Sequence, residues 1–65
     1  MRIIIRGTTC RNKRGFAVRA YEAGRKCADI FVFHLSTAYA IKAAYKAGRE
    51  QDWKYFDGLI REDAA

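Results

Sequence analysis

The chain of 65 residues carries 13 lysines and arginines against 7 aspartates and glutamates, a formal net charge of +6. Domains commonly run to about 100–150 residues, so this length predicts a single domain over residues 1–65. Hydrophobic residues make up 51% of the chain, which excludes a disordered polar tail. The longest uncharged apolar stretch, residues 30–41, is too short for the roughly 20 residues of a membrane span. No secretory signal follows Met1, so we expect a cytoplasmic protein with no membrane contact.

The positive charge is concentrated in the N-terminal part of the chain. Residues 1–26 hold eight lysines and arginines and one acid, a net charge of +7, whereas residues 27–65 have a net charge of −1. Such a field attracts polyanions, but it also occurs on proteins that bind nothing acidic. The charge alone leaves both alternatives open.

The first part of the chain predicts a β-hairpin. Residues 2–9 are rich in β-branched side chains, and their alternation predicts a strand with Ile3 and Ile5 on one face and Arg2, Ile4 and Arg6 on the other. Residues 11–15 contain asparagine and glycine and predict a basic loop. Residues 16–22 alternate again, with Phe16, Val18 and Ala20 opposite Arg19 and Tyr21.

A third strand is predicted over residues 28–35, after a turn at residues 23–26. Both faces of this strand are apolar, as in a strand that is buried on both sides. We place Phe31, Phe33 and Leu35 on the face toward the core and Ile30, Val32 and His34 on the opposite face.

Residues 36–48 predict a helix, with Ser36 or Thr37 as the N-cap and Gly48 as the residue that ends it. Residues 50–62 allow two interpretations, because Asp57-Gly58 is also a hairpin signal. The helical period gathers Trp53, Tyr55, Phe56, Leu59 and Ile60 into one arc, and it favours a second helix.

These elements predict an α+β fold, in which a three-stranded antiparallel sheet (1–35) is followed by one or two helices packed on one of its faces. The predicted core is Ile3, Ile5, Phe16, Val18, Phe31, Phe33, Leu35, Ile41, Tyr45, Trp53, Phe56 and Ile60. In so small a core, burial roughly balances the entropy cost of folding. This balance favours stabilisation by a partner or by a homodimer.

No set of residues predicts catalysis, a metal site or a cofactor. Two cysteines and one histidine cannot complete a four-ligand zinc site. Cys10 and Cys27 fall about 20 Å apart in the predicted sheet, which is too far for a disulfide. We therefore expect two buried or half-buried free thiols. His34 has no nucleophile or carboxylate at a catalytic spacing and is interpreted as a packed or interface histidine. We therefore expect a protein that is not an enzyme.

The outward sheet face and its hairpin combine cations with an aromatic side chain. Guanidinium groups bind phosphate and guanine edges bidentately, and a β-ribbon fits a major groove. The predicted nucleic-acid-binding residues are Arg2, Arg6, Arg11, Lys13, Arg14, Arg19 and Tyr21. Solvated cations that merely protect the sheet edge are the open alternative.

The same face contains a predicted apolar patch, formed by Ile4, Ile30 and Val32, with arginines at its rim. An apolar centre with a charged rim is typical of a protein interface. This patch predicts an alternative function, a phage- or plasmid-type inhibitor or adaptor that binds a protein target.

The predicted order is three strands followed by a helix, with Phe33-x-x-Ser36/Thr37 and then alanines at positions 40, 43, 44 and 47. This pattern resembles the DNA-binding domains of the AP2 type and the arm-binding domains of phage integrases. The resemblance covers roughly residues 14–48. The small-residue helix is also similar to the second helix of double-stranded-RNA-binding domains. The AP2-like resemblance implies that the exposed sheet face reads DNA, through the positions Arg6, Arg19 and Tyr21, with Arg14 near the hairpin. The leading prediction is a small basic nucleic-acid-binding protein that favours DNA over RNA.

Overall fold

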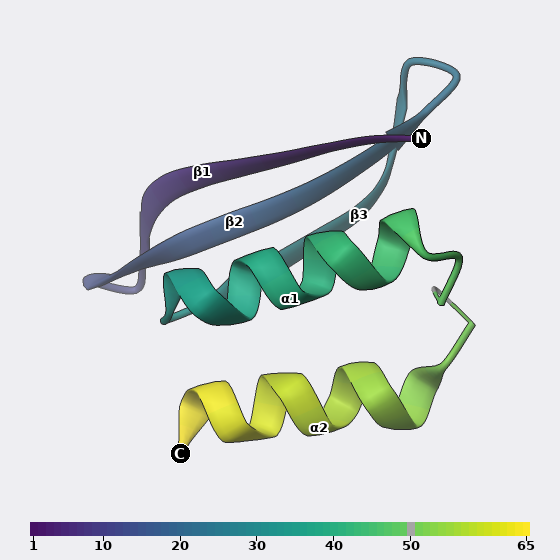
Figure 1. Ribbon diagram of the computed structural model, residues 1–65. Helices are drawn as coiled ribbons and strands as arrows, with labels where there is room; N and C mark the ends of the chain where they lie inside the picture. Colours follow the sequence, from purple (N-terminus) through teal and green to yellow (C-terminus); the bar gives the residue numbers. More distant parts are fainter. Residues whose placement is uncertain (50) are drawn as a thin grey trace.

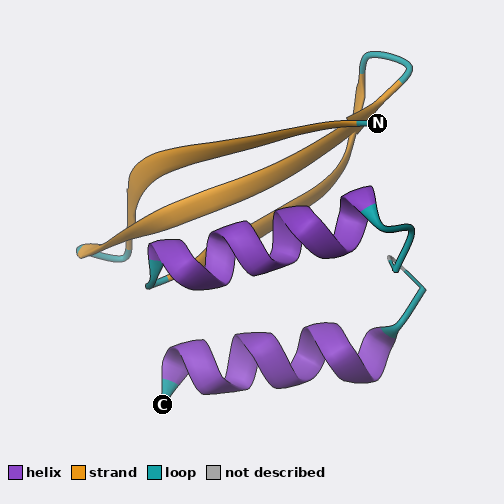
Figure 2. Ribbon diagram, viewed as in Figure 1, coloured by secondary structure: helices purple, strands orange, loops and turns teal. Residues whose placement is uncertain are grey.

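The computed structural model describes residues 1–49 and 51–65. Within them lie strands β1 (Arg2–Cys10), β2 (Lys13–Glu22) and β3 (Arg25–Val32) and helices α1 (Leu35–Lys46) and α2 (Trp53–Ala64). The strands form an antiparallel sheet in the order β1-β2-β3, and both helices lie on the same side of it (Figures 1 and 2). The predicted α+β fold is confirmed. Position 50, where the second helix was predicted to begin, lies outside the described residues. None of the helices in the described ranges is long and apolar enough to cross a membrane.

The β1–β2 hairpin is longer and tighter than predicted. Its last cross-strand pair is Cys10 with Lys13, so only Arg11 and Asn12 form the turn. Both have positive φ, 52° and 65°, as a type I′ hairpin turn requires. The end of this hairpin reaches past the first turn of α1 (Figure 1), which leaves its basic side chains outside the helix-covered part of the sheet.

The core lies between the sheet and α1. Alternate residues of the strands face the helices, and α1 covers them with Ala38 and Ile41, which are fully buried. The small side chain of Ala38 lets the helix approach the sheet closely, while burying a side chain such as Ile41 contributes about 1.5–3 kcal/mol. The buried or partly buried sheet residues of this core are Ile3, Ile5, Phe16, Val18, Ala20, Ala28, Ile30 and Val32.

The predicted facing of the third strand is wrong. Val18 pairs with Ile30, and Phe16 pairs with Val32, and residues directly opposite in a sheet share a face. Ile30 and Val32 therefore face the helices, and Val32 is 0% exposed. Phe31 lies on the outer face, while Phe33 and Leu35, which follow the strand, are 37% and 43% exposed. The alternation in this segment is apolar on both faces, so it could not show which face is inside.

The two ends of α1 are stabilised in different ways. At its C-terminus, Gly48 has a φ of 76°, and the amides of Gly48 and Arg49 donate to the carbonyls of Tyr45 and Ala44 at 3.1 and 2.9 Å. This is a Schellman motif, which confirms the predicted role of Gly48. At its N-terminus, the cap position is His34, and its side chain does not cap the helix. The predicted Ser36 or Thr37 cap is wrong.

Asp63 of α2 binds the backbone that leads into α1. Its carboxylate accepts hydrogen bonds from the backbone amides of Phe33, at 2.6 Å, and His34, at 2.9 Å, and lies 3.0 Å from Nδ1 of His34. Burial of the side chain acts to raise the pKa of Asp63, but the hydrogen bonds from Phe33, His34 and Thr37 outweigh it, and the pKa lies below its ordinary value. A buried carboxylate thus joins the end of α2 to the β3–α1 junction.

Residues 53–64 form a helix, so the hairpin interpretation of Asp57-Gly58 is wrong. Asp52 caps this helix by accepting a hydrogen bond from the amide of Tyr55 at 3.2 Å. Phe56 packs against Tyr45 of α1, with ring centroids 5.3 Å apart. Trp53 is 80% exposed and Ile60 is also exposed, so their assignment to the core is wrong. The apolar face of α2 is therefore wider than the part of it that α1 and β3 cover, and Trp53 and Ile60 lie on the uncovered part.

Candidate nucleic-acid interface

The sheet face opposite the helices carries the predicted arginines. Arg2 pairs with Tyr21, and Ile4 pairs with Arg19. Since the neighbouring pair of Ile3 and Ala20 faces the core, successive side chains of a strand place these residues on the outer face. Arg6 follows on the same face, opposite Ala17. The structure therefore brings Arg2, Arg6, Arg19 and Tyr21 together on one surface, which we call the outer face.

Most cations of the N-terminal part have no acidic partner. Within the described residues, ion pairs engage only two of the eight lysines and arginines of residues 1–26. The other six have no carboxylate within ion-pair distance in that part of the chain; they are Arg2, Arg6, Arg11, Lys13, Arg14 and Arg25. Their charge is available to an external anion.

Asp29 on β3 neutralises part of the outer face. Its carboxylate lies 3.1 Å from Nζ of Lys26 and 3.6 Å from Nε of Arg19. The hydrogen bond from Lys26, with the charges of Lys26 and Arg19, lowers the pKa of Asp29, so its negative charge persists at neutral pH. The uncompensated positive charge of the outer face therefore lies along β1 and at the hairpin, and Arg19 has less of its charge to offer than Arg2 or Arg6.

The basic hairpin does not present all its side chains to the same side. Lys13 lies on the outer-face side of the strand, with Nζ 5.7 Å from the centre of the Phe33 ring. Arg14 pairs with Thr9 and projects from the opposite side of the ribbon, beyond α1. The predicted basic residues of the hairpin thus lie on both sides of the ribbon, and the seven predicted residues do not form one flat surface.

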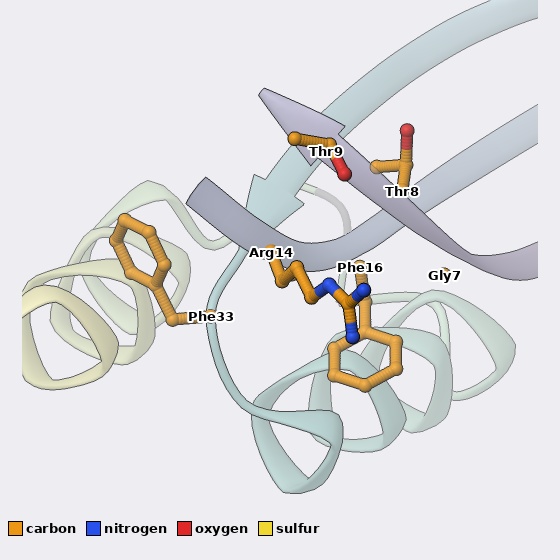
Figure 3. A pocket seen from close by; sticks show the side chains of 7 residues that line it. Gly7, Thr8, Thr9, Arg14, Phe16 and Phe33 are labelled. Carbon is orange, nitrogen blue, oxygen red and sulfur yellow. The ribbon is translucent and has the colours of Figure 1, made fainter. Parts of the chain in front are cut away.

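Two shallow hollows lie at opposite ends of the β1–β2 ribbon. One, of about 560 Å³, is lined by Met1, Arg2, Ile4, Tyr21, Ala23 and Gly24. The other, at the hairpin end, measures about 460 Å³ and is lined by Gly7, Thr8, Thr9, Arg14, Gly15, Phe16 and Phe33 (Figure 3). Thr8, Thr9 and Phe33 were not among the predicted site residues. Thr8-Thr9 looks like ordinary strand sequence, and Phe33 was assigned to the core.

The predicted protein-interface patch does not form. Ile4 lies on the outer face, but Ile30 and Val32 are on the helix side of the sheet. The exposed apolar side chains lie elsewhere. Trp53 and Ile60 of α2 line a groove of about 270 Å³, and the other lining residues are Ile30, Tyr45, Phe56 and Asp57.

The side chains with metal or redox chemistry are dispersed. No group of three or more histidine, cysteine or acidic side chains in residues 1–49 and 51–65 is placed to hold a metal ion. Cys10 and Cys27 are free thiols, and both are exposed, whereas burial was predicted. The His34 side chain is also largely exposed, but it has a partner that the sequence did not reveal, Asp63.

Comparison of the chain with family models, curated proteins and solved structures finds no significant match.

Proposed function

We propose that the protein binds nucleic acid, with DNA favoured over RNA, through the outer face and the basic hairpin, and that it carries no catalytic activity. The observation that carries this proposal is the set of six cations, on the β1–β2 ribbon and at its two ends, that no carboxylate of residues 1–49 and 51–65 pairs with. Cations that no carboxylate neutralises keep their full charge for phosphates. When they bind, the counterions condensed on the nucleic acid are released.

The shape of the ribbon supports the same proposal. Arg2 and Arg6 lie on one face of β1, about 13 Å apart along the strand, and the hairpin beyond them protrudes past α1 (Figure 1). A two-stranded ribbon of this kind fits a major groove, which is about 12 Å wide. The order of three strands followed by a helix resembles that of AP2-type and integrase arm-binding domains. In AP2-like families the exposed sheet face reads DNA, which supports the outer face as the proposed contact. We assign this activity to the cytoplasm.

The test is to replace one outer-face cation and compare it with a matched control. Arg6→Ala removes an unpaired charge from the outer face. Arg61→Ala removes the same charge from α2, where the Arg61 side chain is 80% exposed and pairs only with the exposed Asp57. The affinity for a duplex oligonucleotide is measured by fluorescence anisotropy over a series of salt concentrations.

We expect the affinity of the unmodified protein to fall steeply with salt, with a slope of about 0.9 for each phosphate contact. Arg6→Ala should weaken binding and reduce the salt slope by about 0.9, the contribution of one phosphate contact. Arg61→Ala should leave the slope unchanged. Equal effects of the two substitutions would show that net charge alone, and not the outer face, governs binding. Absence of binding at about 50 mM salt would refute the proposal, because low salt favours phosphate contacts.

The alternative function, an inhibitor or adaptor that binds a protein target, loses the surface assigned to it, because Val32 is buried. A protein-binding role would have to use other residues, such as Trp53. An apolar interface depends little on salt, so the same titration separates the two functions.

A further inference from the structure

The hollow at the hairpin end combines groups that the outer face does not have. Arg14 projects into it between the two phenylalanines, below Thr8 and Thr9 in the view of Figure 3. No ion pair or hydrogen bond engages Arg14 or the two threonine hydroxyls within the described part of the chain. Arg14 and Thr9, which pair across the ribbon, are therefore unpartnered donors at the edge of the hollow, whereas the Thr8 hydroxyl points away from Arg14 (Figure 3).

Phe33 supplies an aromatic surface that its neighbours hold in position and that remains partly exposed. Phe31 packs against it in a T-shaped pair, with ring centroids 5.3 Å apart and planes at 89°, and Lys13 lies near the same ring. The residue is nevertheless 37% exposed. A partly exposed aromatic ring with a cation beside it is the kind of surface on which a base stacks.

Gly7 leaves the floor of the hollow open. A Cβ placed on Gly7 would meet no atom within 4 Å, although its cross-strand partner is the bulky Phe16. With about 460 Å³, the hollow is within the range of about 300–1,000 Å³ that small-molecule sites occupy. A hollow of this size has room for one nucleotide.

We propose that this hollow is a subsite for one unstacked nucleotide of a single-stranded segment. The base lies against Phe33, and the phosphate is held by Arg14 and the hydroxyl of Thr9, its cross-strand partner. The guanidinium group binds phosphate oxygens bidentately, and stacking on a ring does not depend on which base is present. The inference rests on the proposed nucleic-acid binding and adds to it the class of nucleic acid, a single strand or an unpaired end. Bases in an intact duplex are stacked and do not enter.

The experiment fills the hollow without disturbing the core. Gly7→Val places a side chain in open space on a strand, where β-branched residues are favoured, and Phe33→Ala removes the stacking surface. Gly58→Ala, on α2 and also in open space, is the matched control. Each variant is titrated with a single-stranded oligothymidylate and with a blunt duplex at the same salt concentration, after its melting temperature has been recorded.

We expect Gly7→Val and Phe33→Ala to lower the affinity for the single strand about tenfold and to leave duplex affinity within about twofold. Gly58→Ala should change neither, and Arg6→Ala should weaken both.

If the Gly7 and Phe33 variants bind the single strand as the unmodified protein does, the subsite is refuted while the outer-face proposal stands. If both variants weaken single strand and duplex equally, the hollow has no preference for unstacked nucleotides and the proposal is again wrong. If the unmodified protein binds neither oligonucleotide, the proposed function itself fails. Should Gly7→Val not fold, Phe33→Ala decides the matter.

Discussion

At the scale of single residues, Gly15 shows how closely the outer face is packed. It is buried within β2, and a Cβ at this position would overlap the carbonyl oxygen of Val32 and the ring of Phe31. Phe31 therefore lies across the glycine, and a side chain there would have to displace the backbone of β3. The turn prediction treated Gly15 as a loop residue, whereas its role is to let an aromatic ring cross the strand.

We predict that Gly15→Ala destabilises the protein by about 1–3 kcal/mol, the range for overpacking a tight site. Urea unfolding monitored by circular dichroism measures this change. Gly58→Ala serves as the comparison, because its Cβ meets open space and helix propensity alone should stabilise α2 by about 1 kcal/mol. An unfolding midpoint for Gly15→Ala equal to that of the unmodified protein would contradict this account.

At the scale of elements, the attachment of α2 depends on Asp63. Aside from this carboxylate, α2 is held mainly by the packing of Phe56 and Leu59 against the core. Hydrogen bonding lowers the pKa of Asp63 below its ordinary value of 3.8. The folded state therefore prefers the ionised form more strongly than the unfolded chain does. The resulting stability is present in full above about pH 5 and is lost as the pH falls through 3.8 toward the folded pKa.

We predict that Asp63→Asn costs about 1–3 kcal/mol at neutral pH, because the amides of Phe33 and His34 lose a charged acceptor. The melting temperature of the unmodified protein should fall more steeply between about pH 5 and pH 2 than that of the variant. Thermal melts across this range provide the measurement. Parallel pH curves for the two proteins would mean that Asp63 does not hold the junction.

The sequence predicted those elements whose pattern is local. Alternation identified the first two strands, alanine content identified α1, and Gly48 marked its end. The facing of β3 depends instead on which residues oppose it across the sheet, and its apolar side chains fit either face. The Asp63 contact joins residues about 30 positions apart, and no local pattern carries that information. Trp53 was misplaced because an amphipathic arc does not show how much of it a neighbour covers.

At the scale of the whole molecule, the end of the hairpin lies outside the core. Substitutions there can therefore change nucleic-acid affinity without changing the stability of the fold. We predict that replacing Arg11, Lys13 and Arg14 together by alanine weakens binding of oligonucleotides and lowers its salt slope, because up to three phosphate contacts are lost. The melting temperature should change little, since all three side chains are exposed and the Lys13–Phe33 contact, at an exposed site, contributes only about 0.5–1 kcal/mol. A gel-shift assay and a thermal melt test both statements. Unchanged affinity would remove the hairpin from the proposed interface.

The candidate site was predictable where it depends on charge and alternation. Arg2, Arg6, Arg19 and Tyr21 share the outer face because period two is a property of any strand. The hollow at the hairpin end was not predictable, since it depends on Phe33 lying outside the core and on Arg14 turning away from Lys13. The side on which Arg14 lies follows from the register of the hairpin, which the two-residue turn at Arg11 and Asn12 sets. The place of Phe33 depends instead on the β2–β3 pairing and on the β3–α1 junction.

The Asp63 contact also has a consequence for the order in which the chain folds. The strands are joined by short turns and α1 follows β3 directly, so most of the pairing is local and forms early. The end of α2 reaches the β3–α1 junction by closing a loop of about 30 residues, which costs additional entropy. This helix should therefore dock last and open first, as a local unfolding unit. Because the amides of Phe33 and His34 donate to Asp63, their exchange with solvent deuterium would report each opening of α2 while the sheet stays intact.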